Sequence, residues 1–368
     1  MKKVKIIIAL SAIVFAFAGC NSCNQKKSDE IKIGAALPLT GDIASYGKSA
    51  QNGIDLAVDE INSDPNTKIK FAIDYQDTKG DKQTAVNIFQ KFATVDKYSV
   101  VIGEAASGVS QAMIPIATSN KIVQISPISS SPELTGEDYF FRICPSDAFQ
   151  ATISAKWISD DGFKKVGILY VNNAWGKSLM ELFKSNFESR GGKVVDVESS
   201  NEGDKDFKTQ ITKLLHSDID VIYCPTYGKE GGVILKQLKE LGNKFPVYGA
   251  DVWSSPELLT TANYAAEGIK IVKPSELSSD TYNKFKEAFK KKYNTGPDVY
   301  AAYSYDIVMI LKNAMSNTST TGEQVKTFLL SMPVYQGVTG QTKFDSNGDC
   351  NTKPFIKQII KNGNYQSL

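Results

Sequence analysis

The hydrophobic and polar positions after residue 30 alternate between two periods, that of a strand and that of a helix. Short apolar or alternating runs are typical of strands, and apolar residues at every third or fourth position are typical of helices. The first part of the chain therefore predicts strands at Ile31–Ala36, Lys68–Tyr75, Val100–Gly103 and Ile122–Ile125, separated by helices at Lys48–Asn62, Lys82–Phe92 and Val109–Thr118. Strands and helices in this alternation indicate crossover connections and a parallel sheet.

The same rhythm restarts near residue 148, which predicts a second unit of the same kind. Its helices are expected at Phe149–Ser159, Leu179–Ser189, Phe207–Leu215 and Glu230–Leu241, and its strands at Val166–Tyr170, Lys193–Val197, Val221–Tyr223 and Pro246–Gly249. Three further helices follow at Ser279–Tyr293, Ala301–Asn317 and Gly322–Ser331, and the tail at Gly340–Phe344 and Phe355–Lys361 alternates like a β-hairpin. The predicted fold class is α/β, with two parallel-sheet lobes.

The first twenty residues have a different pattern. Three lysines among the first five residues precede an apolar run, Ile6–Ala18, which is shorter than the roughly 20 residues that cross a bilayer. This arrangement is typical of a secretory signal peptide. The run ends in Phe17-Ala18-Gly19-Cys20, which resembles the lipobox of bacterial lipoproteins, although Phe17 stands where leucine is usual. We therefore expect residues 1–19 to be a signal peptide, and residues 20–30 to be a lipidated Cys20 with a polar tether that holds the protein to a membrane surface.

Composition and charge narrow the classes of function. The 368 residues are too many for one core, and 42 basic against 40 acidic residues leave a formal net charge of only +2. This balance disfavours a nucleic-acid binder. A single histidine, the absence of a phosphate loop and the lack of clustered cysteines predict neither a metal nor another cofactor, and they disfavour an enzyme. A disulfide among Cys23, Cys144, Cys224 and Cys350 remains open.

The residues that follow the predicted strands are the candidates for ligand binding, because open α/β sheets bind ligands outside the carboxyl ends of their strands. In the first unit these residues are rich in hydroxyl groups, whereas the second unit contributes aromatic rings and one carboxylate. A serine at a helix N-terminus, such as Ser107, suits a carboxylate, although it can also serve only as a cap. The candidates are Tyr46, Ser107, Ser129 and Ser130 in the first unit, and Trp175, Tyr227 and Asp251 in the second.

Several of these segments together resemble one family. Gly34-x-x-Leu37-x-Leu39-Thr40-Gly41, Ile125-Ser126-Pro127 and Phe344-Asp345, in this order and spacing, are similar to the leucine/isoleucine/valine-binding proteins, the type I periplasmic binding proteins of ABC importers. The resemblance implies two lobes joined by three crossings near Pro145, Lys273 and Tyr335. Lobe 1 is then expected at residues 31–145 and 274–335, and lobe 2 at residues 146–273 and 336–368.

The resemblance also implies roles for individual residues. In amino-acid-binding members, hydroxyls matching Ser107 and Ser130 hold the ligand carboxylate. A backbone carbonyl matching Ile128 and an acidic residue matching Asp251 meet its ammonium group. Aromatic residues match Tyr46, Trp175 and Tyr227, and the small pair Ala105-Ala106 predicts room for a side chain larger than valine. The implied partners are an amino acid and the permease and ATPase subunits of an importer, and the chain is expected to be a monomer.

Two alternatives stay open at this point. The same fold can bind a short amide, urea or an aromatic acid, or it can act as a sensory ligand-binding module. Asp251 distinguishes the ligand classes, because a ligand without an ammonium group has no use for a buried carboxylate there.

Overall fold

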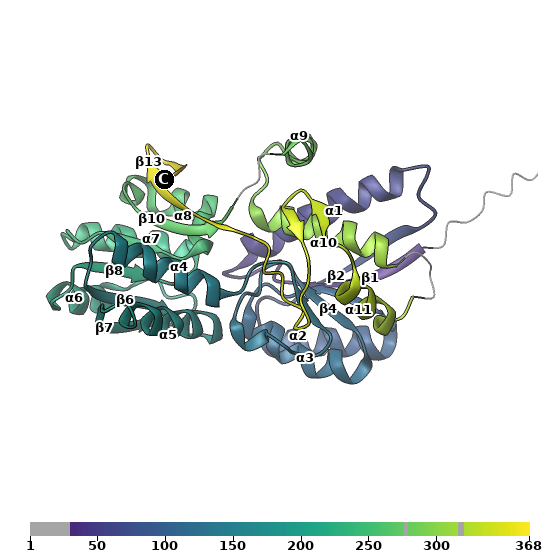
Figure 1. Cartoon of the computed structure of the whole chain (residues 1–368), viewed down its shortest axis with the longest axis horizontal. Coiled ribbons are helices and arrows are strands. Elements are labelled where there is room, and N and C mark those ends of the chain that lie inside the picture. The colour runs from purple at the N-terminus through teal and green to yellow at the C-terminus, as the bar shows by residue number, and fades with distance from the viewer. Residues whose placement is uncertain (1–29, 276–278, 316–319) are drawn as a thin grey trace, which may run out of the picture.

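The computed structural model describes residues 30–275, 279–315 and 320–368. The predicted signal peptide, Cys20 and nearly all of the tether lie outside these residues. In the described part of the chain, no helix is both long and apolar enough to cross a membrane. The chain forms two α/β lobes that lie side by side, with the C-terminal segment running from one to the other (Figure 1).

Lobe 1 is built on a parallel sheet with the strand order β2-β1-β3-β4-β5. Its strands are β1 (Glu30–Leu37), β2 (Lys70–Asp77), β3 (Val100–Gly103), β4 (Val123–Ser126) and β5 (Phe140–Arg142). Its helices are α1 (Ala44–Ser63), α2 (Lys82–Lys91), α3 (Ser107–Asn120), α9 (Asp280–Tyr293), α10 (Val299–Ala314) and α11 (Gly322–Ser331), with short turns η1 (Phe92–Asp96) and η2 (Pro132–Leu134). The strands β1, β3, β4 and β5 are largely buried, as expected of a parallel sheet covered on both faces, whereas most residues of the edge strand β2 are half-buried.

Lobe 2 is built on a mixed sheet with the strand order β14-β13-β10-β9-β8-β6-β7. The strands are β6 (Lys165–Val171), β7 (Lys193–Ser200), β8 (Val221–Cys224), β9 (Val247–Gly249), β10 (Lys270–Pro274), β13 (Phe355–Lys361) and β14 (Asn364–Ser367). The helices are α4 (Asp147–Asp160), α5 (Ala174–Glu188), α6 (Lys208–His216), α7 (Gly228–Glu240) and α8 (Pro256–Ala262), with short turns η3 (Asp251–Ser254) and η4 (Asn263–Ala266). The predicted α/β class with two parallel-sheet lobes is confirmed, apart from the antiparallel edge that β13 and β14 add.

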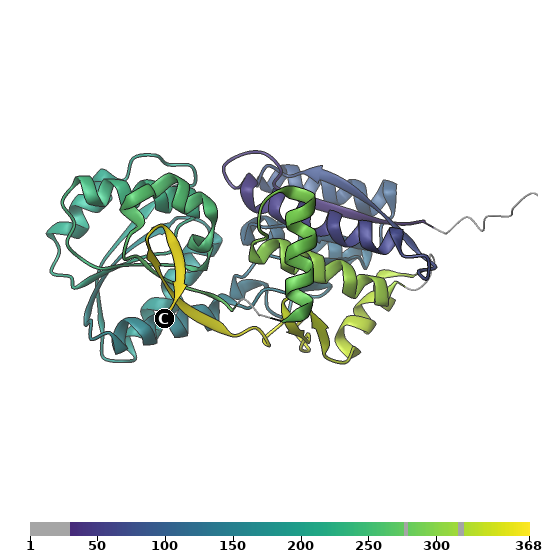
Figure 2. The same ribbon diagram turned by 90° about the horizontal axis from the view of Figure 1, so that it is seen from above.

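The tail differs from its prediction. Gly340–Phe344 and Phe355–Lys361 do not form a hairpin with one another, because β12 (Gly340–Thr342) pairs with β11 (Tyr335–Gly337), and β13 pairs with β10 and β14. Figure 2 shows β13 and β14 as a yellow hairpin on lobe 2, at the end of the last crossing. The alternating pattern identified strands but could not identify their partners, which lie in different lobes.

The third crossing also lies later than predicted. Residues that follow the predicted crossing at Tyr335 still contact lobe 1: Val338 N and Thr339 N donate to Asp306 (both 2.9 Å), and Arg142 forms a buried ion pair with Asp349 (2.7 Å). The predicted boundary between residues 335 and 336 is therefore corrected to a point between Asp349 and β13. The other crossings lie between β5 and α4, and between β10 and α9.

The three described cysteines are buried and unpaired, so a disulfide between any two of Cys144, Cys224 and Cys350 is excluded in this structure. They lie in the first crossing, in β8 and in the last segment of lobe 1.

Candidate ligand-binding site

A loop of serines follows β4 and lines the inner edge of lobe 1. The Ser126 hydroxyl donates to Glu104 O (2.6 Å), and the Ser129 hydroxyl lies 2.8 Å from both Ser110 Oγ and Glu104 O. The Ser129 side chain therefore ties this loop to α3 and is not available to a ligand in this arrangement, although the sequence placed it among the binding candidates.

The N-terminus of α3 lies beside this loop. Ser107, which is 3% exposed, accepts a hydrogen bond from Ser131 N (3.2 Å) and keeps its own proton for a further acceptor. The N–H groups of Ser107 and Gly108 precede the first hydrogen bond of the helix. Ala106 N, in contrast, donates to the buried carboxyl of Glu104, whose pKa burial raises to about 7. For the part of the chain that the structure describes, the free donors therefore belong to Ser107 and Gly108, and Ala106 contributes only its small side chain.

Ser130 and Ile128 complete the contribution of the serine loop. The Ser130 hydroxyl donates to Asp147 Oδ2 (2.8 Å), so it offers lone pairs rather than a proton to any further partner. Among the described residues, Ile128 O accepts no hydrogen bond. Both groups are therefore acceptors, which suits an ammonium group better than a carboxylate.

Asp147 is a candidate that the sequence analysis missed. It begins α4 directly after the first crossing, where Ser146 is the N-cap, and it is only 1% exposed. Burial raises its pKa to about 6, while hydrogen bonds from Ser130 and Gln150 and the nearby Arg142 oppose this rise. Its position after the predicted crossing at Pro145 was the available signal, since a residue there must lie between the lobes.

Asp251 approaches Asp147 from a different part of lobe 2. Gln150 connects the two positions: its Nε2 donates to Asp147 Oδ1 (2.8 Å), and its Oε1 accepts from Asp251 N (2.7 Å). Within the ranges that the structure describes, Asp251 Oδ1 is buried without a hydrogen-bond partner. Burial raises the Asp251 pKa to about 7, and the charge of Asp147 adds to the rise. Two buried carboxyl groups with one orphaned oxygen favour a positively charged hydrogen-bond donor between them.

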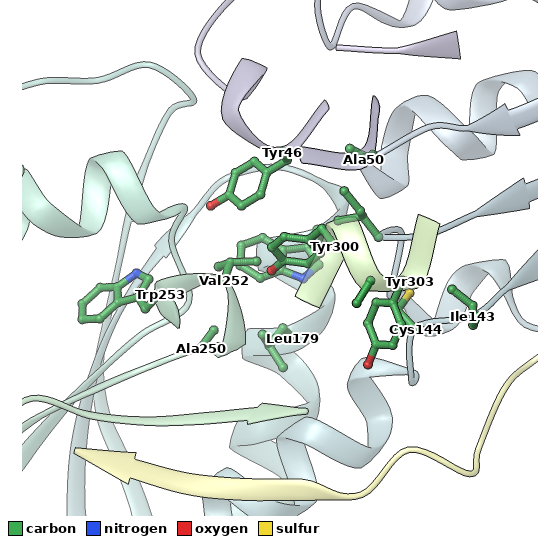
Figure 3. Close-up of a cluster of buried hydrophobic side chains, with 14 of the residues drawn as sticks. Tyr46, Ala50, Ile143, Cys144, Leu179, Ala250, Val252, Trp253, Tyr300 and Tyr303 are labelled. Carbon is green, nitrogen blue, oxygen red and sulfur yellow. The ribbon is translucent and has the colours of Figure 1, made fainter. Parts of the chain in front are cut away.

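Four aromatic rings surround these polar groups. Trp175 and Tyr227 of lobe 2 stack with centroids 5.2 Å apart, and Tyr46 of lobe 1 lies 6.0 Å from Tyr227. Tyr300, a second candidate that the sequence did not single out, meets Tyr46 edge to face at 5.4 Å. Figure 3 shows Tyr46 and Tyr300 next to one another, with Val252 of lobe 2 beside Tyr300.

The lobes touch directly around this site. Gly228 N at the start of α7 donates to the Tyr46 hydroxyl (3.0 Å), Ser45 donates to Glu257 (2.7 Å), and Lys229 lies 3.2 Å from Asp42. A Cβ on Gly228 would lie 2.3 Å from Ser255 Oγ, which is also on lobe 2, so the start of α7 packs against the residue before α8 without room for a side chain. A cavity of about 120 Å³, lined by Tyr227 and by residues of both lobes, remains at the junction.

The sequence-predicted candidates thus meet from two lobes: Tyr46, Ala106, Ser107, Ile128 and Ser130 on lobe 1, with Trp175, Tyr227 and Asp251 on lobe 2. The free donors lie on lobe 1 beside the serine loop, and that loop reaches the carboxyl groups of lobe 2 through the bond from Ser130 to Asp147. This fold and this junction define a two-lobed solute-binding protein.

Comparison with known proteins gives the family. The family model described as "Periplasmic binding protein" matches residues 30–364, and the chain belongs to that family. It is similar to the branched-chain amino acid transporter substrate-binding protein LivJ from Streptococcus pneumoniae, solved with isoleucine: 30% identity, TM-score 0.85, and coverage of 92% of this chain and 98% of that one.

Two further relatives agree with this membership. The leucine-binding protein LivK from Thermotoga maritima has 28% identity and a TM-score of 0.84, covering 92% of this chain and 97% of its own. The Leu/Ile/Val-binding protein BraC3 of Rhizobium johnstonii is 27% identical over 89% of this chain and 90% of its own. The predicted family resemblance is confirmed. The family is one of binding proteins rather than of enzymes, and its periplasmic description assigns the protein to a location outside the cytoplasm.

Proposed function

We propose that this protein is the substrate-binding component of an ABC importer and that it captures an amino acid with a branched or otherwise apolar side chain between its lobes. The relatives named above support the ligand class. The observation that carries the proposal is that the buried carboxyl groups of Asp147 and Asp251 lie on lobe 2, whereas the free donors of Ser107 and Gly108 lie on lobe 1, beside the serine loop that reaches Asp147. An amino-acid zwitterion suits this arrangement, because its carboxylate can accept from the donors and its ammonium group can donate to the carboxyl groups.

In this proposal the two ends of the amino acid bind to different lobes. The carboxylate accepts from the Ser107 hydroxyl and from the first N–H groups of α3, where the helix dipole also favours negative charge. The ammonium donates to Asp251 Oδ1, Ile128 O and the Ser130 hydroxyl, beside the negative charge of Asp147. Ser130 thus changes from the carboxylate role implied by the family to an ammonium role.

The side chain of the ligand lies against the aromatic rings and the small pair Ala105-Ala106, which are all largely buried. Because each lobe supplies only part of the contacts, the full binding free energy is available only when the lobes are closed. The ligand therefore selects the closed state, and hinge motion at the three crossings opens it.

A thermal-shift screen tests the proposal directly. The twenty amino acids are compared with short amides, urea and aromatic acids, since a tight ligand raises the melting temperature by mass action. We expect the largest increases in melting temperature with leucine, isoleucine, valine or another apolar amino acid. We also expect the ligand to be recovered chemically unchanged after binding. A screen in which only an amide, urea or an aromatic acid stabilises the protein would contradict the proposal.

We also propose that Cys20 carries a lipid and holds the mature protein to a membrane as a monomer. The lipobox-like Phe17-Ala18-Gly19-Cys20 supports this. Full-length protein expressed in a bacterium should partition into the detergent phase of a Triton X-114 extraction, and Cys20→Ser should move it to the aqueous phase. Equal partitioning of the two proteins would exclude lipidation at Cys20.

Transport is distinguished from sensing by uptake. Deletion of the gene should abolish high-affinity uptake of the radiolabelled amino acid, and the Asp251→Ala protein should fail to restore it. Normal uptake in the deletion strain would favour the sensory role.

A further inference from the structure

Three helices begin at the same place in the junction of the lobes. In lobe 1, α2 and α3 follow β2 and β3, and in lobe 2, α5 follows β6, so each helix begins at the carboxyl edge of its sheet. A Cβ on Gly108, in the first turn of α3, would lie 3.3 Å from Ala174 Cβ at the start of α5 and 3.3 Å from Lys82 Cε at the start of α2. The three N-termini therefore converge, and their dipoles add to one region of positive potential.

Lys82 brings a further positive charge to this region. It is the first residue of α2, its side chain is exposed, and its Nζ would lie 3.6 Å from the same Cβ on Gly108. A Cβ is tilted towards the N-terminus of its helix. The ammonium group therefore lies on the side of α3 to which the free N–H groups of its first turn point.

No residue in the described ranges pairs with the Lys82 ammonium group through an ion pair or a hydrogen bond. Asp81, the N-cap of α2, accepts from Thr84 N at 2.8 Å and from the Thr84 hydroxyl at 2.7 Å. The buried carboxyl of Glu104 accepts from Ala106 N. Since a positive charge at a helix N-terminus is electrostatically unfavourable, Lys82 occupies a position that the fold by itself disfavours. Such conflicts with local preference are expected at functional sites.

We propose that Lys82 makes the binding site selective for ligands that carry a carboxylate group. This inference rests on the proposed function, in which the carboxylate accepts from Ser107 and Gly108. Lys82 stands at the rim of that position, where α3 of lobe 1 meets α5 of lobe 2.

The selectivity has a physical reason in the closure of the lobes. Asp147 and Asp251 by themselves would accept any amine. The positive ends of α3 and α5, together with Lys82, oppose the contact between the lobes until a negative charge lies between them. A carboxylate supplies that charge, so an amino acid favours closure, whereas an amine without a carboxylate is repelled.

Calorimetry with leucine and leucinamide tests this inference on the intact mature chain. Leucinamide has the same side chain and ammonium group but no carboxylate. We expect Lys82→Gln to weaken the binding of leucine and to leave the binding of leucinamide unchanged or tighter. The ratio of the two affinities should fall about fivefold or more, as for the loss of an exposed charge pair. An unchanged ratio overturns the proposal.

Two further variants separate this role from a general effect of charge. Lys32→Gln is the matched control, because Lys32 is an exposed lysine near the amino end of β1 and thus at the opposite edge of the same sheet. It should leave the ratio unchanged. Lys82→Arg keeps the charge and should keep the ratio within about twofold of the wild-type value. An equal fall in the Lys32 variant, or a fall in Lys82→Arg as large as in Lys82→Gln, would contradict the assignment.

The association rate gives a second readout. A charge at the rim of a site acts mainly on the rate of association. Stopped-flow fluorescence should show slower association of leucine with Lys82→Gln than with the wild-type protein at 0.01 M salt, where the Debye length is about 30 Å. The difference should vanish at 1 M salt, where the Debye length is about 3 Å. A difference that does not depend on salt would contradict an electrostatic role.

A measurement without ligand separates a functional role from a structural one. Because Lys82 stands unfavourably at a helix N-terminus, Lys82→Gln should keep or raise the melting temperature of the ligand-free protein. A lower melting temperature would show that Lys82 supports the fold, and it would overturn the proposal whether or not an amino acid binds. If no amino acid binds the wild-type protein, the proposed function fails. If leucine binds but the ratio of affinities is unchanged in Lys82→Gln, only the role of Lys82 fails.

Discussion

At the scale of single residues, the junction is dominated by the buried carboxyl groups of Asp147 and Asp251, and Arg142, the partner of Asp349, compensates the charge of Asp147 only in part. Asp147 and Asp251 both have raised pKa values, because burial disfavours their charged forms and each charge disfavours the other. In the ligand-free protein this arrangement costs stability at neutral pH. An ammonium group between the carboxylates removes that cost. The free energy that the ligand-free protein loses by burying the two charges therefore adds to the binding free energy of the ligand.

Removal of one carboxylate should therefore abolish tight binding. We expect Asp251→Ala to weaken binding of the best amino acid by about a hundredfold or more, because a buried ammonium loses its counter-charge. Isothermal titration calorimetry measures this change. Asp218→Ala is the matched control, since the Asp218 side chain is on lobe 2 and 85% exposed. A change of less than threefold in the Asp251 variant would exclude the ammonium role.

The same carboxyl groups predict a pH dependence. Their folded-state pKa values, about 6 and about 7, lie above the ordinary aspartate value of 3.8, so the stability of the ligand-free protein should fall as pH rises from 3.8 to about 7. Ligand binding needs the ionised forms, so affinity should rise over the same range. We expect the melting-temperature increase caused by the ligand to be larger at pH 8 than at pH 5, and Asp251→Asn to remove most of this difference. An increase that is constant with pH, or larger at pH 5, would contradict the assignment.

At the scale of elements, the segment from β11 to Asp349 shows how a strand pair is held on a lobe whose main sheet it does not join. The backbone of β11 and β12 folds over Asp306 of α10, which accepts from Val338 N, Thr339 N and the Thr339 hydroxyl. Lys353 donates to Thr339 and Thr342 from the other side. These buried bonds explain why the chain stays on lobe 1 beyond Tyr335 and crosses later.

Loss of the Asp306 carboxylate should loosen this segment. Asp306→Ala leaves two buried N–H groups without an acceptor, and we expect the free energy of unfolding to fall by about 3 kcal/mol. Urea denaturation followed by circular dichroism measures it, with the exposed Asp218→Ala as control. A loss of less than about 0.5 kcal/mol would show that the segment is held mainly by its apolar contacts.

At the scale of the whole molecule, the function depends on how the lobes meet. The bonds from Gly228 N to Tyr46 and from Ser45 to Glu257 join residues about 200 positions apart in the chain, and they exist only while the lobes touch. They contribute to the closed state without contacting the polar ends of a ligand. Closure is therefore a property of both lobes and of the three crossings together.

Weakening of the closed state should reduce affinity without changing selectivity. Tyr46→Phe keeps the ring and removes the hydroxyl that accepts from Gly228 N, so we expect ligand affinity to fall about fivefold, the equivalent of one hydrogen bond. The order of preferred amino acids should not change. Small-angle scattering should show a smaller radius of gyration with ligand than without it in both proteins. Equal radii in the wild-type protein would contradict closure on binding.

Periodicity predicted most helices and strands, because each helix buries an apolar stripe and each strand an apolar face, and both recur at a fixed spacing in the sequence. The predicted strand Val100–Gly103 has the bounds of β3, and the predicted helix Gly322–Ser331 has those of α11. Helix starts were less accurate: α5 begins at Ala174 rather than Leu179, because Asn173 caps it through Gly176 N, and a cap is not part of the apolar stripe. The strand pairing of the tail depended on contacts between distant segments and was predicted wrongly.

The sequence alone determined the α/β class, the two lobes, the family, and the positions after each strand where polar side chains gather. It did so because periodicity and strand-end chemistry are local properties of the chain. Only the tertiary structure decided which of these groups remain free. The Ser129 hydroxyl bonds within lobe 1, and the Ser130 hydroxyl donates to Asp147. Asp147, Gln150 and Asp251 lie together on lobe 2, near Tyr300 of lobe 1. These contacts join segments up to about 150 residues apart. The direction of each hydrogen bond and the burial of each group depend on the packing of several segments, so they cannot be read from any one of them.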